Sequence, residues 1–140
     1  MDETPDEVLT ELLAVDRIAV VGCSATPGKA AHGVPQYMQR RGYEIVPVNP
    51  FHDEVLGERA YDALADVPGT VPLVNVFRPS AEVPDLIDQV LARREARGDA
   101  GGVWFQLGVR DDEAVARGRA NGLTVVQDRC IQVEHRRVLG

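Results

Sequence analysis

The chain has 140 residues, 44% of them hydrophobic and 26% charged, so it is long enough to bury one core and too apolar for a disordered protein. Its formal net charge of −7 argues against nonspecific binding to nucleic acid or anionic membranes, because both depend on an excess of basic residues. The apolar runs fall short of the ~20 residues of a membrane span, and the acidic start is unlike a signal peptide. We therefore expect one cytoplasmic domain over residues 1–140.

The chain begins with a predicted helix over residues 1–14. Thr4-Pro5-Asp6-Glu7 has the form of a capping box, with Thr4 at the N-cap and Pro5 at the first helical position. Short apolar runs rich in β-branched residues then predict five strands, at residues 17–21, 44–48, 72–77, 102–106 and 123–127. Helical patterns lie between them at residues 34–41, 62–67, 81–97 and 111–121, with glycines at the ends of three, namely Gly42, Gly98 and Gly122.

Strands that alternate with helices and are apolar on both faces indicate a parallel sheet covered on both sides. The predicted fold class is therefore α/β, a doubly wound and mainly parallel five-stranded sheet in three layers. In such a sheet ligands bind beyond the carboxyl ends of the strands, where the strand order reverses. The segments that follow the predicted strands are polar or turn-forming, so we expect the functional residues there.

The loop after the first strand reads GCSATPGKAAHG, from Gly22 to Gly33. A dinucleotide-binding loop needs G-x-G-x-x-G, and here the corresponding positions are Gly22, Ser24 and Pro27, so only the glycine of the tight turn is present. Because a proline lacks a backbone donor and clashes with the preceding helical turn, Pro27 indicates that the helix begins later, around residues 30–34. A Walker A loop is excluded, because no hydroxyl residue follows the lysine.

This longer loop suits a pyrophosphate. Its backbone N–H groups and the hydroxyls of Ser24 and Thr26 are suitable donors, and Lys29, the only lysine in the chain, adds a mobile charge. The alternative is a glycine-rich turn with a solvated lysine.

The end of the second strand reads Val48-Asn49-Pro50 and lacks the acid that binds the ribose 2′-OH of NAD. A neutral Asn49 tolerates a ribose with a nearby phosphate, as in NADP or coenzyme A, where a carboxylate would repel it. Arg78, after the third strand, offers a bidentate partner for such a phosphate.

Motifs at the ends of all five strands resemble the bacterial CoA-binding domain family, which is related to the CoA-binding domain of the succinyl-CoA ligase alpha subunit. The resemblance runs from about Ala14 to Leu139. It is carried by residues 18–24 with Pro27 and Lys29, by Val46-Pro47-Val48-Asn49-Pro50, by Val76-Phe77-Arg78-Pro79, by Trp104-Phe105-Gln106-Leu107-Gly108 and by Asp128-Arg129-Cys130.

The resemblance implies a Rossmann-like fold that binds coenzyme A or an acyl-CoA. It places the pyrophosphate on the loop of Gly22, Ser24 and Lys29. It also implies that the adenosine lies near Asn49, Pro50, Phe77 and Arg78, and that the pantetheine arm runs towards Gln106, Gly108 and Cys130. The chain departs from the ligase after Pro50, where Phe51-His52-Asp53-Glu54 replaces lysines. The resemblance also does not extend to the ligase's second domain, which carries its phosphorylated histidine.

No catalytic group or metal site is legible in the sequence. The histidines His32, His52 and His135 are scattered, and the two cysteines have no metal-ligand spacing. We expect Cys23 to pack under the loop, residues 104 and 105 to lie in the core, and residues 134–137 to form a solvated basic end rather than a self-association edge. His32 is either a phosphate contact or a polar residue at a helix start.

Three functions remain open from the sequence. The first is a module that holds coenzyme A or an acyl-CoA without chemistry of its own, alone, as a homo-oligomer or with an enzyme partner. The second is a small CoA-dependent enzyme that exchanges acyl groups or thiols through Cys130, beside Arg129. The favoured interpretation of Cys130 is nevertheless a small hydrophobic residue buried in the core. The third is NADP-dependent oxidoreduction, which the fold permits.

Overall fold

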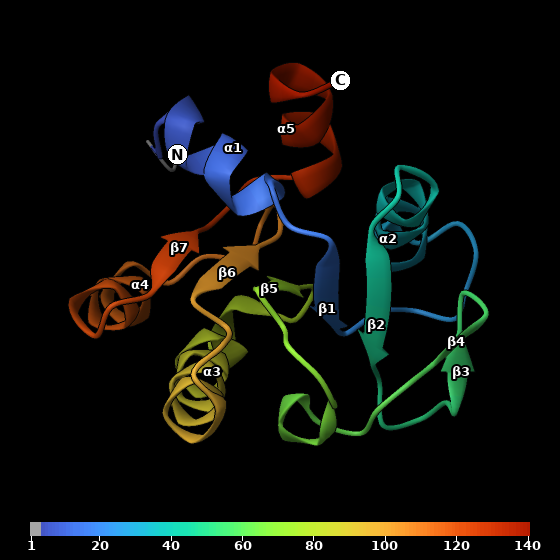
Figure 1. Ribbon diagram of the computed structural model, residues 1–140, viewed down its shortest axis with the longest axis horizontal. Coiled ribbons are helices and arrows are strands. Elements are labelled where there is room, and N and C mark those ends of the chain that lie inside the picture. The colour runs from blue at the N-terminus through green and yellow to red at the C-terminus, as the bar shows by residue number, and fades with distance from the viewer. Residues whose placement is uncertain (1–3) are drawn as a thin grey trace.

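The computed structural model describes residues 4–140, and its centre is a sheet of five strands (Figure 1). The strands are β1 (Arg17–Val21), β2 (Glu44–Val48), β5 (Leu73–Val76), β6 (Gly102–Phe105) and β7 (Thr124–Val126). They are ordered β2-β1-β5-β6-β7 and every neighbouring pair is parallel. The order reverses between β1 and β5, so the edge beyond these two strands is the switch point where such sheets bind ligands.

Helices cover both faces of the sheet (Figure 1). One face packs against α1 (Asp6–Leu13), α2 (Ala30–Arg40) and α5 (Ile131–Val138). The other packs against α3 (Val83–Arg97) and α4 (Asp112–Ala120). The predicted three-layer, Rossmann-like α/β fold with a parallel five-stranded sheet is thus confirmed.

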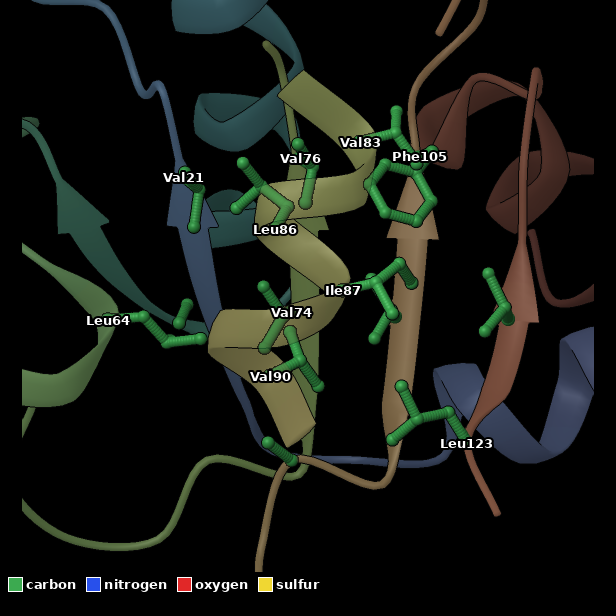
Figure 2. Packing of buried hydrophobic residues seen from close by; sticks show 14 of the residues in the cluster. Val21, Leu64, Val74, Val76, Val83, Leu86, Ile87, Val90, Phe105 and Leu123 are labelled. Carbon is green, nitrogen blue, oxygen red and sulfur yellow. The ribbon is translucent and has the colours of Figure 1, made fainter. Parts of the chain in front are cut away.

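Alternating strand residues supply the two cores. On β1, Val20 belongs to the cluster beneath α1, α2 and α5, whereas Val21 belongs to the cluster beneath α3 and α4. Figure 2 shows Leu86, Ile87 and Val90 of α3 lying over the second face of the sheet. Burial on both faces explains why the strands read as continuous apolar runs.

Pro35 of α2 leaves one carbonyl of the first helical turn free to bond to the preceding loop. It lies inside the helix and has no N–H, so it cannot donate to the Ala31 carbonyl four residues earlier. That carbonyl instead accepts a hydrogen bond from the Ser24 N–H, at 2.8 Å. A proline that interrupts the helix ladder thereby fixes the first turn of α2 against the loop after β1.

Several element boundaries differ from the predictions. Helix α1 begins at Asp6 with Pro5 at the N-cap, one residue later than predicted, and residues 1–3 of that predicted helix lie outside the described part. Helix α2 begins at Ala30, as the position of Pro27 indicates. The helices predicted at 62–67 and at the start of 81–97 are 3-10 turns, η1 (Leu64–Asp66) and η2 (Ser80–Glu82). A short unpredicted hairpin joins β3 (Glu54–Val55) to β4 (Glu58–Arg59).

The prediction of a solvated basic end at residues 134–137 holds for Arg136 and Arg137, which are exposed on α5, but it is wrong for His135. His135 is buried there, with its ring 5.8 Å from that of Tyr37 and 5.7 Å from that of Tyr43. Arg137 forms an ion pair of 2.8 Å with Asp6 of α1 and another of 2.7 Å with Glu134. The charged side chains therefore tie α5 to α1 while the histidine packs inward.

Residues 4–140 contain no helix that is both long enough and apolar enough to cross a membrane.

Candidate functional site

A cleft of about 500 Å³ lies at the switch point beyond β1 and β5. Its walls come from the loops that follow β1, β2, β4 and β5, from the first turn of α2 and from the first two turns of α3. Most of the predicted binding residues meet here, although they come from three loops that are well separated in the sequence. Those that line the cleft are Gly22, Ser24, Lys29, Asn49, Pro50, Phe77 and Arg78.

Gly22 is the point at which the loops after β1 and β5 touch. Its φ is +83°, and a Cβ added there would lie 2.7 Å from the Phe77 carbonyl oxygen and 2.9 Å from Cδ of Arg78. Its N–H donates to the Val48 carbonyl at 3.0 Å. Gly22 forms the predicted tight turn. A side chain at this position would collide with the Phe77 carbonyl and with the Arg78 side chain.

The loop after β1 is braced by hydrogen bonds between its own residues. Besides the Ser24 N–H bound to Ala31, the Thr26 N–H donates to Oγ of Ser24 at 3.0 Å. Nδ1 of His32 lies 2.8 Å from the Ser24 carbonyl oxygen, and because a carbonyl only accepts, this nitrogen carries the proton. His32 therefore supports the loop from the helix side. Thr26 is exposed and does not line the cleft.

The first turn of α2 and Lys29 supply the positive end of the cleft. The N–H groups of His32 and Gly33 already donate to the Lys29 carbonyl, whereas those of Ala30 and Ala31 precede the first intrahelical bonds. Ala31 lines the cleft. The Lys29 side chain is exposed and has no hydrogen bond or ion pair with any residue from 4 to 140. Helix dipole, amide donors and a mobile ammonium group thus coincide, which favours an anion.

Asn49 holds two walls of the cleft together. Its Nδ2 donates to the Cys23 carbonyl at 2.9 Å, and its Oδ1 accepts from the Phe51 N–H at 2.8 Å. Both ends of the amide are thereby used within the protein. Phe51 stands at the rim with 85% of its surface exposed. Cys23 lies fully buried behind the loop, as predicted, and burial raises the pKa of its thiol to about 12.

Arg78 is paired inside the cleft. Its Nε lies 3.1 Å from Oε1 of Glu82 and its Nη2 lies 2.8 Å from Oε2, which is a bidentate contact. Hydrogen bonding to this carboxylate raises the pKa of Arg78 above its ordinary value. Asp62 also lines the cleft, so two acids face the two bases Lys29 and Arg78. The sequence prediction missed both acids, although the spacing of four residues between Arg78 and Glu82 was a signal for an ion pair.

Besides Thr26, three predicted site residues lie beyond the cleft, namely Gln106, Gly108 and Cys130. The Gln106 side chain is buried and its Oε1 accepts from the Ile131 N–H at 3.3 Å. The Gly108 N–H donates to Oδ1 of Asp128 at 2.7 Å. Cys130 is half-buried at the N-cap of α5. It lines a second groove, of about 440 Å³, with Leu107, Val133 and charged residues of α1 and α5.

Within the described range, no group of three or more His, Cys, Asp or Glu side chains is arranged to hold a metal ion. Residues 104 and 105 are fully buried in the sheet, as predicted.

Comparisons with known proteins point to one family. The family model described as CoA binding domain matches residues 16–136. The uncharacterized protein YneT of Bacillus subtilis (strain 168) is 42% identical over 119 residues, which cover 85% of this chain and 84% of YneT. A solved structure of a protein from Pyrococcus horikoshii OT3 is 33% identical, with a TM-score of 0.89, and the match covers 99% of this chain and 94% of that one.

An enzyme contains a similar segment. The ADP-forming acetate–CoA ligase II of Archaeoglobus fulgidus is 28% identical over 106 residues. The match covers 74% of this chain but only 15% of the ligase, so the similarity concerns one segment of a much longer protein.

Proposed function

The chain belongs to the CoA binding domain family, and from this premise we propose that it binds coenzyme A or an acyl-CoA in the cleft beyond β1 and β5. The observation that carries the proposal is the exposed Lys29, which has no hydrogen bond or ion pair within residues 4–140 and lies beside the first turn of α2 on the wall of that cleft. A pyrophosphate placed there meets amide donors, the positive end of the helix dipole and a mobile cation.

The remaining cleft residues suit the rest of the ligand. We propose that the adenosine lies near Asn49, Pro50 and Phe77, and that Arg78 meets the 3′-phosphate. Because Asn49 is neutral, it does not repel a phosphorylated ribose, whereas an acid at this position would. The pantetheine arm then leads along the ends of β5 and β6 towards Gln106, Gly108 and Cys130.

We propose a binding role and assign no reaction to the chain. The ligase contains much more than the shared segment, and its activity is not carried over. Cys130 lies in a groove separate from the cleft, so an exchange through its thiol would require the ligand to span both sites.

The ligand is tested by isothermal titration calorimetry with CoA and NAD. We expect CoA to bind and NAD to bind at least roughly tenfold more weakly, because Asn49 offers no carboxylate to the ribose 2′-OH of NAD. Equal affinities for the two ligands would overturn the assignment, and so would the absence of any CoA binding.

The placement of the pyrophosphate is tested by Lys29→Ala. Loss of one charge-assisted contact of ~1.5 kcal/mol should weaken CoA binding roughly tenfold, without changing the melting temperature of the free protein. Arg40→Ala is the matched control, since it removes an exposed base from the far end of the same helix. Equal affinities of the Lys29→Ala variant and the parent would show that the ammonium group faces solvent in the complex.

A further inference from the structure

Arg78 is held by the protein in the place where it would have to meet a ligand. Its aliphatic stem packs against Gly22, since Cδ lies 2.9 Å from the position that a Cβ would take there. Its guanidinium forms both bonds of the bidentate contact with Glu82. The side chains of Arg78 and Glu82 are 44% and 40% exposed, so the pair lies in the mouth of the cleft and is open to solvent and ligands.

Glu82 occupies this position because of the local structure. It ends the 3-10 turn η2 and is the N-cap of the 15-residue helix α3. An acid at a helix N-terminus is favourable, because it faces the positive end of the helix dipole. The same carboxylate is four residues beyond Arg78, at the spacing of an ion pair along a helix. Glu82 is therefore an anion built into the cleft, already bound to the base that a phosphate would use.

We propose that Glu82 is a specificity-determining residue, which competes with the 3′-phosphate of the ligand for the Arg78 guanidinium. The proposal rests on the proposed CoA binding. A phosphate monoester carries nearly two negative charges at neutral pH, and the Glu82 carboxylate carries one. A doubly charged group therefore displaces Glu82 from the bidentate contact more effectively than a singly charged one.

The competition has a direct consequence for affinity. When the phosphate takes Arg78, Glu82 loses its partner and remains close to a second anion. Neutralising Glu82 removes both costs, so binding should become tighter although a charged residue of the site has been lost. A purely structural ion pair predicts the opposite, because its loss would loosen Arg78 and weaken binding.

The experiment is a double-mutant cycle, measured by calorimetry with CoA. Glu82→Gln keeps the length of the side chain and should tighten CoA binding roughly threefold to fivefold, the range of an exposed ion pair. The gain should be clearly smaller when Arg78→Ala is also present, because the competition needs the guanidinium and only the repulsion between Glu82 and the phosphate remains. Unchanged or weaker binding in Glu82→Gln, or an equal gain with and without Arg78, would overturn the proposal.

Two controls separate this inference from the proposed function. Glu95→Gln removes an acid from the same helix about 20 Å away and should leave affinity unchanged. Dephospho-CoA lacks the 3′-phosphate, so Glu82→Gln should not tighten its binding, and an equal gain would contradict the competition with that phosphate. If the parent protein does not bind CoA at all, the proposed function fails. If it binds CoA and the cycle shows no coupling, only the role of Glu82 fails.

Discussion

Gly22 is constrained both by a positive φ and by close neighbouring atoms, whereas Gly28 is constrained by a positive φ alone. Gly22 has a φ of +83° and two neighbouring atoms closer than 3.0 Å to the position of an added Cβ, whereas Gly28 has a φ of +94° and open space around it. We expect Gly28→Ala to cost ~1 kcal/mol of unfolding free energy for the backbone alone. Gly22→Ala should cost about 2–4 kcal/mol, because overpacking is added. Urea unfolding measures both, and equal losses would contradict the close contact with the Phe77 carbonyl.

For single residues of the site, the location was predictable from the sequence but the hydrogen-bond partners were not. Gly22, Lys29 and Asn49 follow strands in a recognisable pattern, so their presence at one edge of the sheet was predictable. The two hydrogen bonds that consume the Asn49 amide were not, because they join it to backbone atoms whose positions depend on the folded loops. The ion pair of Arg78 with Glu82 was only partly predictable. The spacing of four residues indicates a contact, but it does not show that the contact lies inside a cleft.

At the scale of elements, the docking of α5 should depend on pH. Burial lowers the pKa of His135 below its ordinary value near 6.5, and the nearby Arg41 lowers it further. The unfolded chain therefore binds this proton more readily than the folded protein, so the free energy of unfolding falls as the pH drops below about 6.5. His135→Gln should lose less stability between pH 7 and pH 5 than the parent, as measured by urea unfolding.

The control for this prediction is His52→Gln, which removes an exposed histidine outside the α5 contact. An identical pH profile for the parent and His135→Gln would show that protonation of His135 does not oppose the packing against Tyr37 and Tyr43.

Arg93 of helix α3 holds η1 and the segment that follows it in place. Arg93 is buried and donates to the carbonyls of Leu64, Val67 and Gly69 at 2.7–3.0 Å, and it pairs with Asp99 at 3.0 Å. Arg93→Met should cost about 3–5 kcal/mol of unfolding free energy, because it leaves a buried carboxylate without its partner. Urea unfolding checks the value against the exposed neighbour Arg97→Met, and equal losses would contradict this role.

Elements differ in how well the sequence predicts them. The strands and α3 have long apolar patterns, and the predicted ranges agree with the structure to within a residue or two. Helix α5 buries only Ile131 and His135, so its sequence reads as a charged end. The strands β3 and β4 have two residues each, too few to show any period.

At the scale of the whole molecule, the alternation of strands and helices was sufficient to predict three layers and to place the site at one edge. It did not predict which loops would share a cleft, because this depends on the strand order. That order places β1 and β5 side by side, which brings the loops after residues 21 and 76 together. The loops after β6 and β7 form a separate groove with α1 and α5.

The central claim is that coenzyme A is bound in the cleft beyond β1 and β5, and hydrogen–deuterium exchange with and without CoA tests it most directly. In the free protein, the amides of Ala30 and Ala31 should exchange quickly, because they precede the first intrahelical bonds of α2. We predict that CoA slows exchange in residues 22–31 and 77–82, and that Lys29→Ala reduces this protection at equal ligand concentration. Protection confined to residues 128–134, beside Cys130, with no change in residues 22–31, would contradict the account.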